Sequence, residues 1–161
     1  MITIIFKAVE KCNSNCVYCE VIAKRQNAIM EYGLLKEVLQ KINDYLVKYT
    51  EEEINITWHG GEVCLLGATY FLKAIEFLDK YCPTTKKRIR HAIQSNLTLI
   101  NEEIIDAFKI LGIKTVGTSY EYIPLDAILV NGSINTKAPH CEWVTHFMTN
   151  YFEPITGLMM R

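Results

Sequence analysis

The sequence lacks the features that mark membrane, secreted and nucleic-acid-binding proteins. Its 17 basic and 18 acidic residues leave a formal net charge of −1, which provides no electrostatic reason to expect nucleic acid or an anionic membrane as partner. No apolar run approaches the roughly 20 residues that a bilayer-spanning helix needs. The apolar N-terminus has no basic stretch before it, so it does not resemble a signal peptide. We therefore expect a cytoplasmic protein.

Proline-rich linkers, low-complexity segments and internal repeats are also missing. The chain of 161 residues has only four prolines, and half of its residues are hydrophobic. This length and composition are sufficient for one compact domain with a sizeable core, so we expect residues 1–161 to form a single domain.

Cysteine, in contrast, is frequent and clustered. Three of the six cysteines fall within eight residues, with three and two residues between them: Cys12, Cys16 and Cys19. The other three are scattered: Cys64, Cys82 and Cys141. In a reducing compartment the cluster is typical of a ligand set, whereas isolated cysteines are usually small buried hydrophobic residues.

Hydrophobic periodicity predicts alternating strands and helices along the first 119 residues. The predicted strands cover 3–8, 54–58, 88–94 and 113–119, and the predicted helices cover 34–50, 68–81 and the stretch between Asn101, as N-cap, and Gly112. This order predicts a parallel α/β sheet with right-handed crossovers and outer helices.

The last 40 residues are less regular. Residues 126–136, with Asn131-Gly132 at their centre, are expected to form a small hairpin. An amphipathic helix is predicted over 142–152, and a fifth strand over 155–160. Residues 122–161 are thus an irregular C-terminal segment with one helix.

Polar and ligating residues follow each predicted strand, where α/β sheets place their chemistry. The cysteine cluster follows the first strand and Gly60-Gly61-Glu62 the second, while Ser95 and Asn96 follow the third and Ser119 the fourth. Gly-Gly allows close backbone approach to a ligand, and the Glu62 carboxylate can accept from an ammonium group. Taken alone, Gly-Gly-Glu is as compatible with a tight turn and a helix-capping Glu.

The three clustered thiols leave the kind of metal open. A closed zinc site needs a fourth ligand, for which His59 or His140 with Cys141 are the candidates. Three thiolates on one loop can instead hold three irons of a cubane cluster and leave the fourth iron open to a small molecule.

The motifs resemble those of one known family. The loop CNSNCVYC resembles the CxxxCxxC signature of the radical S-adenosylmethionine (SAM) superfamily, with Tyr18 at its aromatic position. The stretches His59-Gly60-Gly61-Glu62 and Gln94-Ser95-Asn96, followed by Leu99-Ile100-Asn101, are similar to the patterns HGGEPLL and QTNGxLIN. These patterns belong to the subgroup of anaerobic sulfatase-maturating enzymes and radical maturases of ribosomal peptides.

The resemblance implies a partial (β/α) TIM-type barrel, truncated after about four to five parallel strands, in which Cys12, Cys16 and Cys19 bind a [4Fe-4S] cluster. Glu62, with the Gly60-Gly61 backbone, would meet the amino group of SAM. The remaining SAM contacts would be the backbone of Tyr18 at the adenine, Ser95 and Asn96 near the methionine carboxylate or ribose, and Ser119 completing the pocket.

The implied activity is reductive cleavage of SAM to a 5′-deoxyadenosyl radical, which abstracts hydrogen from a peptide or protein substrate. An electron donor such as flavodoxin or ferredoxin would be a partner. The sequence departs from the patterns of this subgroup at two positions. Glu121 stands where an Asp often faces the substrate, and Cys64 stands where the HGGEPLL pattern has Pro.

Two alternatives remain. The family barrel has six strand-helix units, so the chain could be an inactive cluster- and SAM-binding remnant or a partner subunit. It could also be a small zinc protein.

Overall fold

The computed structural model describes residues 1–14, 19, 27–118, 129–130 and 133–134. Strands and helices alternate along the chain as the sequence predicts: β1 (Ile2–Val9), α1 (Tyr32–Lys48), β2 (Ile54–Gly60), α2 (Gly67–Tyr81), β3 (Ile89–Gln94), α3 (Glu102–Leu111) and β4 (Ile113–Gly117). Two short 3₁₀ helices, η2 (Val63–Leu66) and η3 (Lys86–Arg88), precede α2 and β3. Strand β4 ends two residues earlier than predicted, because its partner β3 ends at Gln94, opposite Gly117.

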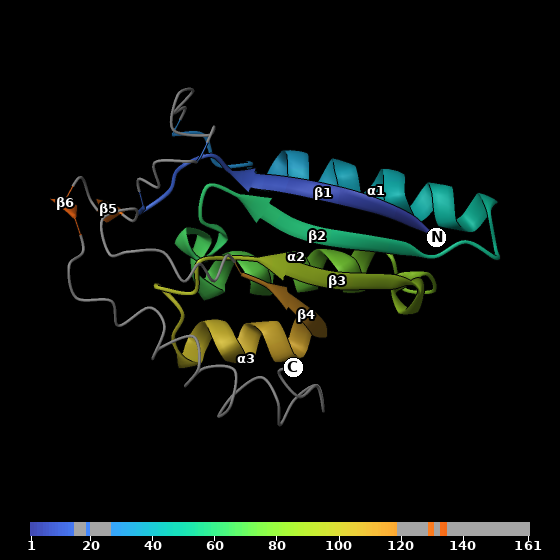
Figure 1. Cartoon of the computed structure of the whole chain (residues 1–161). Coiled ribbons are helices and arrows are strands. Elements are labelled where there is room, and N and C mark those ends of the chain that lie inside the picture. The colour runs from blue at the N-terminus through green and yellow to red at the C-terminus, as the bar shows by residue number, and fades with distance from the viewer. Residues whose placement is uncertain (15–18, 20–26, 119–128, 131–132, 135–161) are drawn as a thin grey trace.

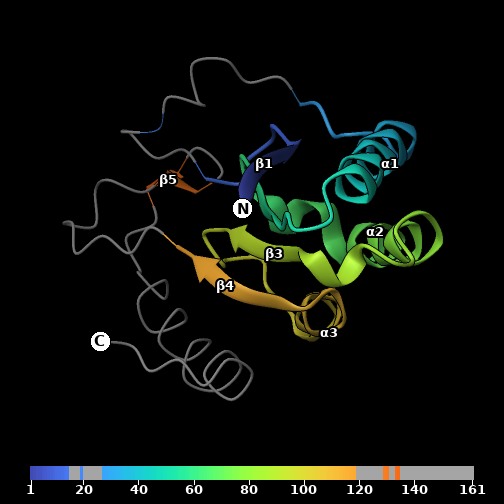
Figure 2. The ribbon, with the colours of Figure 1, turned by 90° about the vertical axis from the view of Figure 1, so that its right-hand side faces the viewer.

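The four long strands form one parallel sheet in the order β1-β2-β3-β4. All four arrows point the same way, and α1, α2 and α3 lie side by side on one face of the sheet (Figures 1 and 2). The predicted α/β architecture is therefore confirmed. Since the strands are parallel, their carboxyl ends meet at one edge, which brings the segments after β1, β2 and β3 together.

The core between sheet and helices is centred on Trp58 of β2. Its side chain is fully buried, and the register places it between Phe6 of β1 and Ile93 of β3. The Trp58 ring meets Phe6 edge-on, with ring centroids 5.2 Å apart, and packs against Phe71 of α2 at 5.5 Å. Such edge-to-face pairs add to the free energy gained by burying the rings. The first pair joins β1 to β2, and the second joins β2 to α2.

Residues of the local sequence determine both ends of helix α3. The Asn101 side chain accepts a hydrogen bond from the Ile104 amide at 2.9 Å, and Glu102 and Glu103 lie in the first turn, where negative charge complements the helix dipole. Gly112 ends the helix in the left-handed conformation, with φ of 78°. Both predicted end residues are confirmed.

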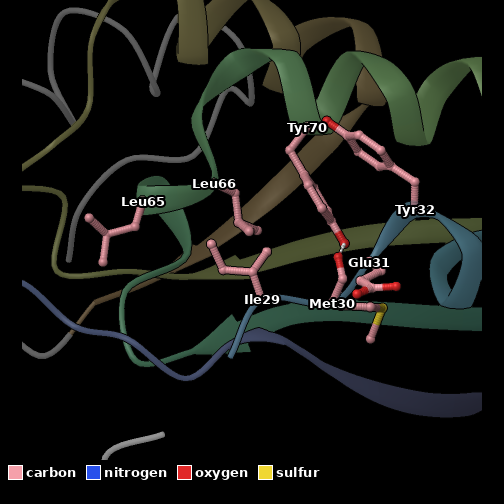
Figure 3. A pocket seen from close by; sticks show the side chains of 7 residues that line it. All are labelled: Ile29, Met30, Glu31, Tyr32, Leu65, Leu66 and Tyr70. Atoms are coloured by element: carbon pink, nitrogen blue, oxygen red, sulfur yellow. Dashed lines mark hydrogen bonds between the residues drawn. The ribbon is translucent and has the colours of Figure 1, made fainter. Parts of the chain in front are cut away.

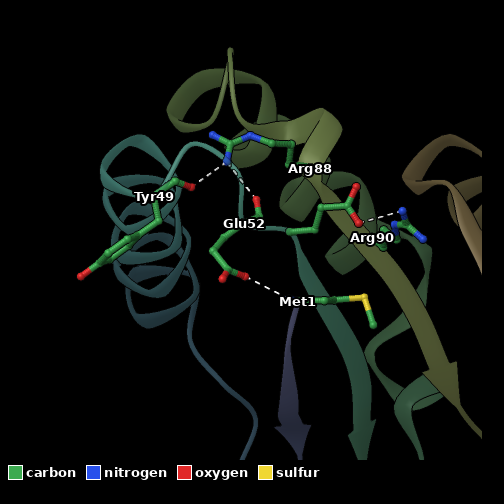
Figure 4. Close-up of polar contacts among 6 residues, drawn as sticks. Met1, Tyr49, Glu52, Arg88 and Arg90 are labelled. Carbon is green, nitrogen blue, oxygen red and sulfur yellow. Dashed lines mark hydrogen bonds and ion pairs between the residues drawn. The ribbon is translucent and has the colours of Figure 1, made fainter.

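At the amino edge of the sheet, Arg88 joins three segments (Figure 4). Its guanidinium donates to the carbonyls of Tyr49 at 3.0 Å and Glu52 at 2.9 Å, and to the Leu46 carbonyl at 2.7 Å. These carbonyls lie at or just beyond the C-terminus of α1, where a positive charge is favourable. Ion pairs of Met1 with Glu52 and of Arg90 with Glu53 lie beside it.

The predicted hairpin is also present. β5 (Leu129–Val130) and β6 (Ser133–Ile134) pair antiparallel. The helix predicted over 142–152 and the strand predicted over 155–160 lie outside the described residues. Within the described part of the chain, none of the helices is long and apolar enough to cross a membrane.

The carboxyl end of β2 lies very close to the backbone that leaves β1. The Gly61 amide donates to the Val9 carbonyl at 2.8 Å, and the Glu62 amide donates to the Lys11 carbonyl at 2.9 Å. A Cβ atom on Gly60 would stand 1.9 Å from the Val9 carbonyl oxygen, and one on Gly61 would stand 2.3 Å from that of Lys11. Gly60 also has φ of 152°, which side chains rarely allow. Only glycine fits at either position.

Substitution at Gly60 should therefore be far more damaging than at a helical glycine. Gly60→Ala should lower the free energy of unfolding by several kcal/mol, because the β1 and β2 ends must separate. Gly33, in α1, has nothing within 4 Å of its missing Cβ. Gly33→Ala should be neutral or stabilising by up to ~1 kcal/mol. Denaturant titration of both variants tests this contrast, and equal stabilities would contradict the close approach.

His91 of β3 is buried below the helices, between Ile56 and Ile113 in the sheet. The Trp58 indole N–H donates to His91 Nδ1 at 3.3 Å, which requires that nitrogen to be unprotonated. Burial lowers the pKa of His91 from 6.5 to about 4. The imidazole is therefore neutral in the folded protein at neutral pH.

This burial predicts a loss of stability in acid. Between pH 6.5 and about 4 the unfolded chain binds a proton at His91 that the folded chain does not, so stability falls as the pH falls through this window. The loss attributable to His91 is on the order of 3 kcal/mol. The variant His91→Gln keeps an acceptor without the titration, and its free energy of unfolding should depend less on pH in this window. Parallel pH profiles would contradict the assignment.

Candidate functional site

The site is formed where the segments after β1, β2 and β3 converge. The cysteine loop begins after Val9, the Gly60-Gly61-Glu62 stretch closes β2, and Ser95 with Asn96 follows β3. Side chains and backbone groups from all three segments are joined by hydrogen bonds. The structure therefore brings together the residues predicted at this edge, as far as they fall within the described part of the chain.

Glu62 is the centre of these contacts. Its side chain is 1% exposed, and its carboxylate accepts three hydrogen bonds. Oε1 accepts from the Cys64 amide at 2.9 Å and from the Ser95 hydroxyl at 2.6 Å, while Oε2 accepts from the Asn96 amide at 2.7 Å. The bond from Cys64 caps η2, which is the turn-and-cap role that the sequence left open. Glu62 thus ties the end of β2 to the end of β3.

Cys64 extends this group with a buried thiol. Burial, together with the nearby Glu62 carboxylate, raises the pKa of Cys64, so the thiol stays protonated. Its sulfur lies 3.3 Å from the Ser95 hydroxyl oxygen. Because that hydroxyl gives its proton to Glu62, Cys64 is the donor to Ser95. Cys64 and Cys82 are both buried, which confirms the expectation for these two scattered cysteines.

The start of the cysteine loop rests on the segment after β3. The Asn96 side-chain amide donates to Asn13 Oδ1 at 3.0 Å and to the Ser14 hydroxyl at 3.1 Å. The Ser14 backbone amide in turn donates to Cys12 Sγ at 3.3 Å. The backbone next to Cys12 is therefore joined to the segment after β3 through Asn96.

Of the three predicted metal ligands, Cys12 and Cys19 are described and are half-buried, whereas Cys16 lies outside the described residues. Within the described ranges no three Cys, His, Asp or Glu side chains gather closely enough to hold a metal ion. The donor chemistry nevertheless fits an iron–sulfur cluster, since Cys12 receives an amide donor of the kind that tunes cluster sulfurs.

Other predicted residues have the following places. Tyr18, Ser119 and Glu121 lie outside the described part of the chain, as do His140 and Cys141. His59 is described, and its Nδ1 accepts from the Gly60 amide at 2.6 Å. A metal could therefore reach His59 only through Nε2.

No motif in the sequence indicates a role for Asn13, Ser14 or Thr98. Thr98 donates from its backbone amide and its hydroxyl to Asn96 Oδ1, at 3.0 and 2.7 Å. The bonds that join Asn13 and Ser14 to Asn96 and Thr98 link residues more than 80 positions apart along the chain. The only sequence signal was the run of small polar residues inside the cysteine loop itself.

A pocket of about 340 Å³ opens beside η2 (Figure 3). Its walls come from the segment before α1, the first residue of α1, η2 and α2: Ile29, Met30, Glu31, Tyr32, Leu65, Leu66 and Tyr70. The Tyr70 hydroxyl donates to the Met30 carbonyl at 2.9 Å, and its ring stacks on Tyr32 with centroids 5.4 Å apart. Burial raises the pKa of Tyr70 to about 12, so this hydroxyl stays a donor.

Comparison with curated proteins finds several relatives. An uncharacterized protein of Methanocaldococcus jannaschii is 35% identical over 127 residues, which cover 78% of this chain and 41% of that protein. A cysteine-type anaerobic sulfatase-maturating enzyme of Clostridium novyi is 28% identical over 154 residues, which cover 89% of this chain and 40% of the enzyme. The chain thus spans about two fifths of the length of these relatives.

Solved structures share the fold. Native anSMEcpe with bound AdoMet and Kp18Cys peptide superposes with a TM-score of 0.75 over 92% of this chain and 40% of that chain, at 21% sequence identity. This structural similarity supports the predicted fold, a partial (β/α) TIM-type barrel.

A family model agrees with both comparisons. The model of the radical SAM superfamily matches residues 7–145, a range that begins in β1 and includes the cysteine loop and the ends of β2 and β3. This match covers most of the chain and confirms the family inferred from the motifs. The chain belongs to the radical SAM superfamily.

Proposed function

We propose that this chain holds a [4Fe-4S] cluster and SAM at the carboxyl edge of its sheet and makes a 5′-deoxyadenosyl radical that abstracts hydrogen from a peptide or protein substrate. Family membership supports the cluster, and the AdoMet (another abbreviation for SAM) bound in the matched solved structures supports the second cofactor. The observation that carries the proposal is the direct attachment of the cysteine loop to the Glu62 group through Asn96.

Cys12, Cys16 and Cys19 would hold the cluster, and an open iron beside them would take SAM. When both cofactors are bound, they supply the radical by one-electron reduction and cleavage of SAM. The residues of this chain bind, orient and shield the reacting groups. A reduced flavodoxin or ferredoxin would provide the electron, which is consistent with the cytoplasmic location expected from the sequence.

For Glu62 we propose two roles. Its carboxylate has about four acceptor positions, three of which are used by protein donors. The first role is to keep the β2 and β3 ends together through the three bonds. The second is to accept a hydrogen bond from the amino group of SAM at the fourth position, on Oε2. The Gly60-Gly61 backbone, which directly precedes Glu62 in the chain, is proposed to take part in this contact. Contacts of Tyr18, Ser95, Asn96 and Ser119 with SAM stay predictions.

A peptide or protein substrate is proposed from the relatives. Several are named sulfatase-maturating enzymes, and two matched structures contain a peptide as well as AdoMet. Glu121 remains the candidate for a substrate contact. Since the chain spans between about a quarter and two fifths of these enzymes, the activity of the whole enzyme is part of this proposal.

The proposal is tested by anaerobic reconstitution with iron and sulfide. The protein should become brown, with about four irons and four sulfides per chain as a [4Fe-4S] cluster requires. After reduction with dithionite it should convert SAM to 5′-deoxyadenosine and methionine, measured by liquid chromatography. A colourless protein without iron would refute the proposal.

The ligand assignment is tested by a matched pair of cysteine variants. Cys16→Ala should abolish cluster formation, because one of three thiolates is lost. Cys82→Ala should keep the cluster, since Cys82 is fully buried beneath α1, with its thiol directed at the Leu39 carbonyl at 3.5 Å. Iron and sulfide content and the absorbance of the cluster are the measurements. The opposite pattern would show that the ligands are assigned wrongly.

A second candidate is a protein that binds the cluster and SAM without turnover. It is supported by the four-stranded sheet, whose edge strands β1 and β4 each have one neighbour in that sheet within the described residues. A cluster that forms and binds SAM but yields no 5′-deoxyadenosine would favour it. One equivalent of zinc without acid-labile sulfide would instead favour the zinc alternative, with His59 or His140 as fourth ligand.

A further inference from the structure

Asn13, Asn96 and Thr98 form a closed ring of side-chain hydrogen bonds. Asn96 Nδ2 donates to Asn13 Oδ1 at 3.0 Å, Asn13 Nδ2 donates to the Thr98 hydroxyl at 2.7 Å, and that hydroxyl donates to Asn96 Oδ1 at 2.7 Å. Each of the three side chains is both donor and acceptor within the ring. We call these three residues the polar ring.

The orientation of every group in the polar ring is fixed by one backbone amide. The Thr98 N–H can only donate, and it lies 3.0 Å from Asn96 Oδ1, so this atom is the amide oxygen and not the nitrogen. Asn96 Nδ2 must then donate to Asn13 Oδ1, which leaves Asn13 Nδ2 to donate to Thr98. The bonds polarise one another in the same direction around the ring, an arrangement that strengthens each of them.

The backbone between two members of the ring is held in an unusual conformation. Leu97 has φ of 59°, the left-handed region that costs a branched residue roughly 1–2 kcal/mol. Its side chain is 1% exposed, and its amide donates to the Ser95 hydroxyl at 2.9 Å. This turn brings the Thr98 amide and hydroxyl back onto Asn96. A non-glycine residue kept in such a conformation points to a local requirement for that turn.

The polar ring acts on the loop that carries the cluster ligands. The base of this loop is held by backbone bonds of Glu10 to Ala28 at 2.9 Å and of Met30 to Ala8 at 2.8 Å. Beyond the base, the ring holds Asn13, the residue directly after the first predicted ligand, Cys12. Asn96 also donates from its backbone amide to Glu62. One residue therefore contacts both the ligand loop and the carboxylate at the centre of the site.

We propose that the polar ring is a positioning device: Asn13, Asn96 and Thr98 fix the first ligand of the cysteine loop relative to the end of β3 and the Glu62 carboxylate, and so set the position of the cluster relative to bound SAM. The part that concerns SAM rests on the proposed function. The part that concerns the loop does not, because the ring consists only of side chains of this chain.

The experiment uses two substitutions at Thr98, which is exposed and so can be changed with little effect on folding. Thr98→Val keeps the shape and removes the hydroxyl, which breaks two of the three ring bonds. Thr98→Ser keeps the hydroxyl and serves as the matched control. Amide hydrogen exchange at Ser14 in the cofactor-free protein should be faster in Thr98→Val and unchanged in Thr98→Ser.

The second measurement is made on the reconstituted protein. The affinity for SAM should be about tenfold weaker in Thr98→Val, as expected for the loss of one to two hydrogen bonds. The change that SAM produces in the electron paramagnetic resonance spectrum of the reduced cluster should also differ from that of the unmodified chain. Thr98→Ser should restore both. Iron content should remain close to that of the unmodified protein.

The outcomes are separable. If the unmodified chain binds no iron, the proposed function fails, while exchange at Ser14 still tests the ring. If Thr98→Val matches the unmodified chain in both exchange and SAM affinity, the ring has no positioning role. Equal defects in Thr98→Val and Thr98→Ser would likewise overturn the proposal, because the hydroxyl would not be the cause.

Discussion

The arrangement of the site depends on the buried carboxylate of Glu62. Removing a carboxylate from water costs several kcal/mol unless donors replace the lost hydration. Here the replacement comes from the Cys64 amide, the Ser95 hydroxyl and the Asn96 amide, which belong to two different segments of the chain. Neither segment can move away without leaving the carboxylate unsatisfied. The ends of β2 and β3 are therefore held in one relative position, and the cysteine loop is attached to that position through Asn96.

Much of the fold was accessible from the sequence because its signals are local. Alternation in β2 and the apolar face of α3 depend on periods of two and 3.6 residues, and Asn101 and Gly112 act within a few residues of themselves. The assignment of the three cysteines as ligands also rests on a local signal, their spacing within one loop, and stays a prediction. The edge on which the predicted site residues meet followed from the strand order alone.

The contacts of the site could not be predicted, because they join residues far apart in the chain. From the sequence, the carboxylate of Glu62 and the two glycines at the end of β2 were both expected to contact a ligand. The structure shows that the missing side chains of Gly60 and Gly61 admit the backbone of Val9 and Lys11, and that Glu62 is surrounded by protein donors. In β3, in contrast, His91 shares one face with Ile89 and Ile93, so the pattern places it on the buried side, but it does not show the hydrogen bond from Trp58 of β2. The burial of His91 is decided by the helices that cover that face.

The closed ring of Asn13, Asn96 and Thr98 has a consequence for how this chain can change over evolutionary time. Each member supplies a donor to one neighbour and an acceptor to the other, so replacing any one removes two of the three ring bonds. The three positions are thus expected to be kept or lost together in descendants of this sequence, although Asn13 and Asn96 lie 83 positions apart and Asn13 and Thr98 lie 85 positions apart. Linked inheritance of distant small polar residues would be the trace that such a ring leaves in a lineage.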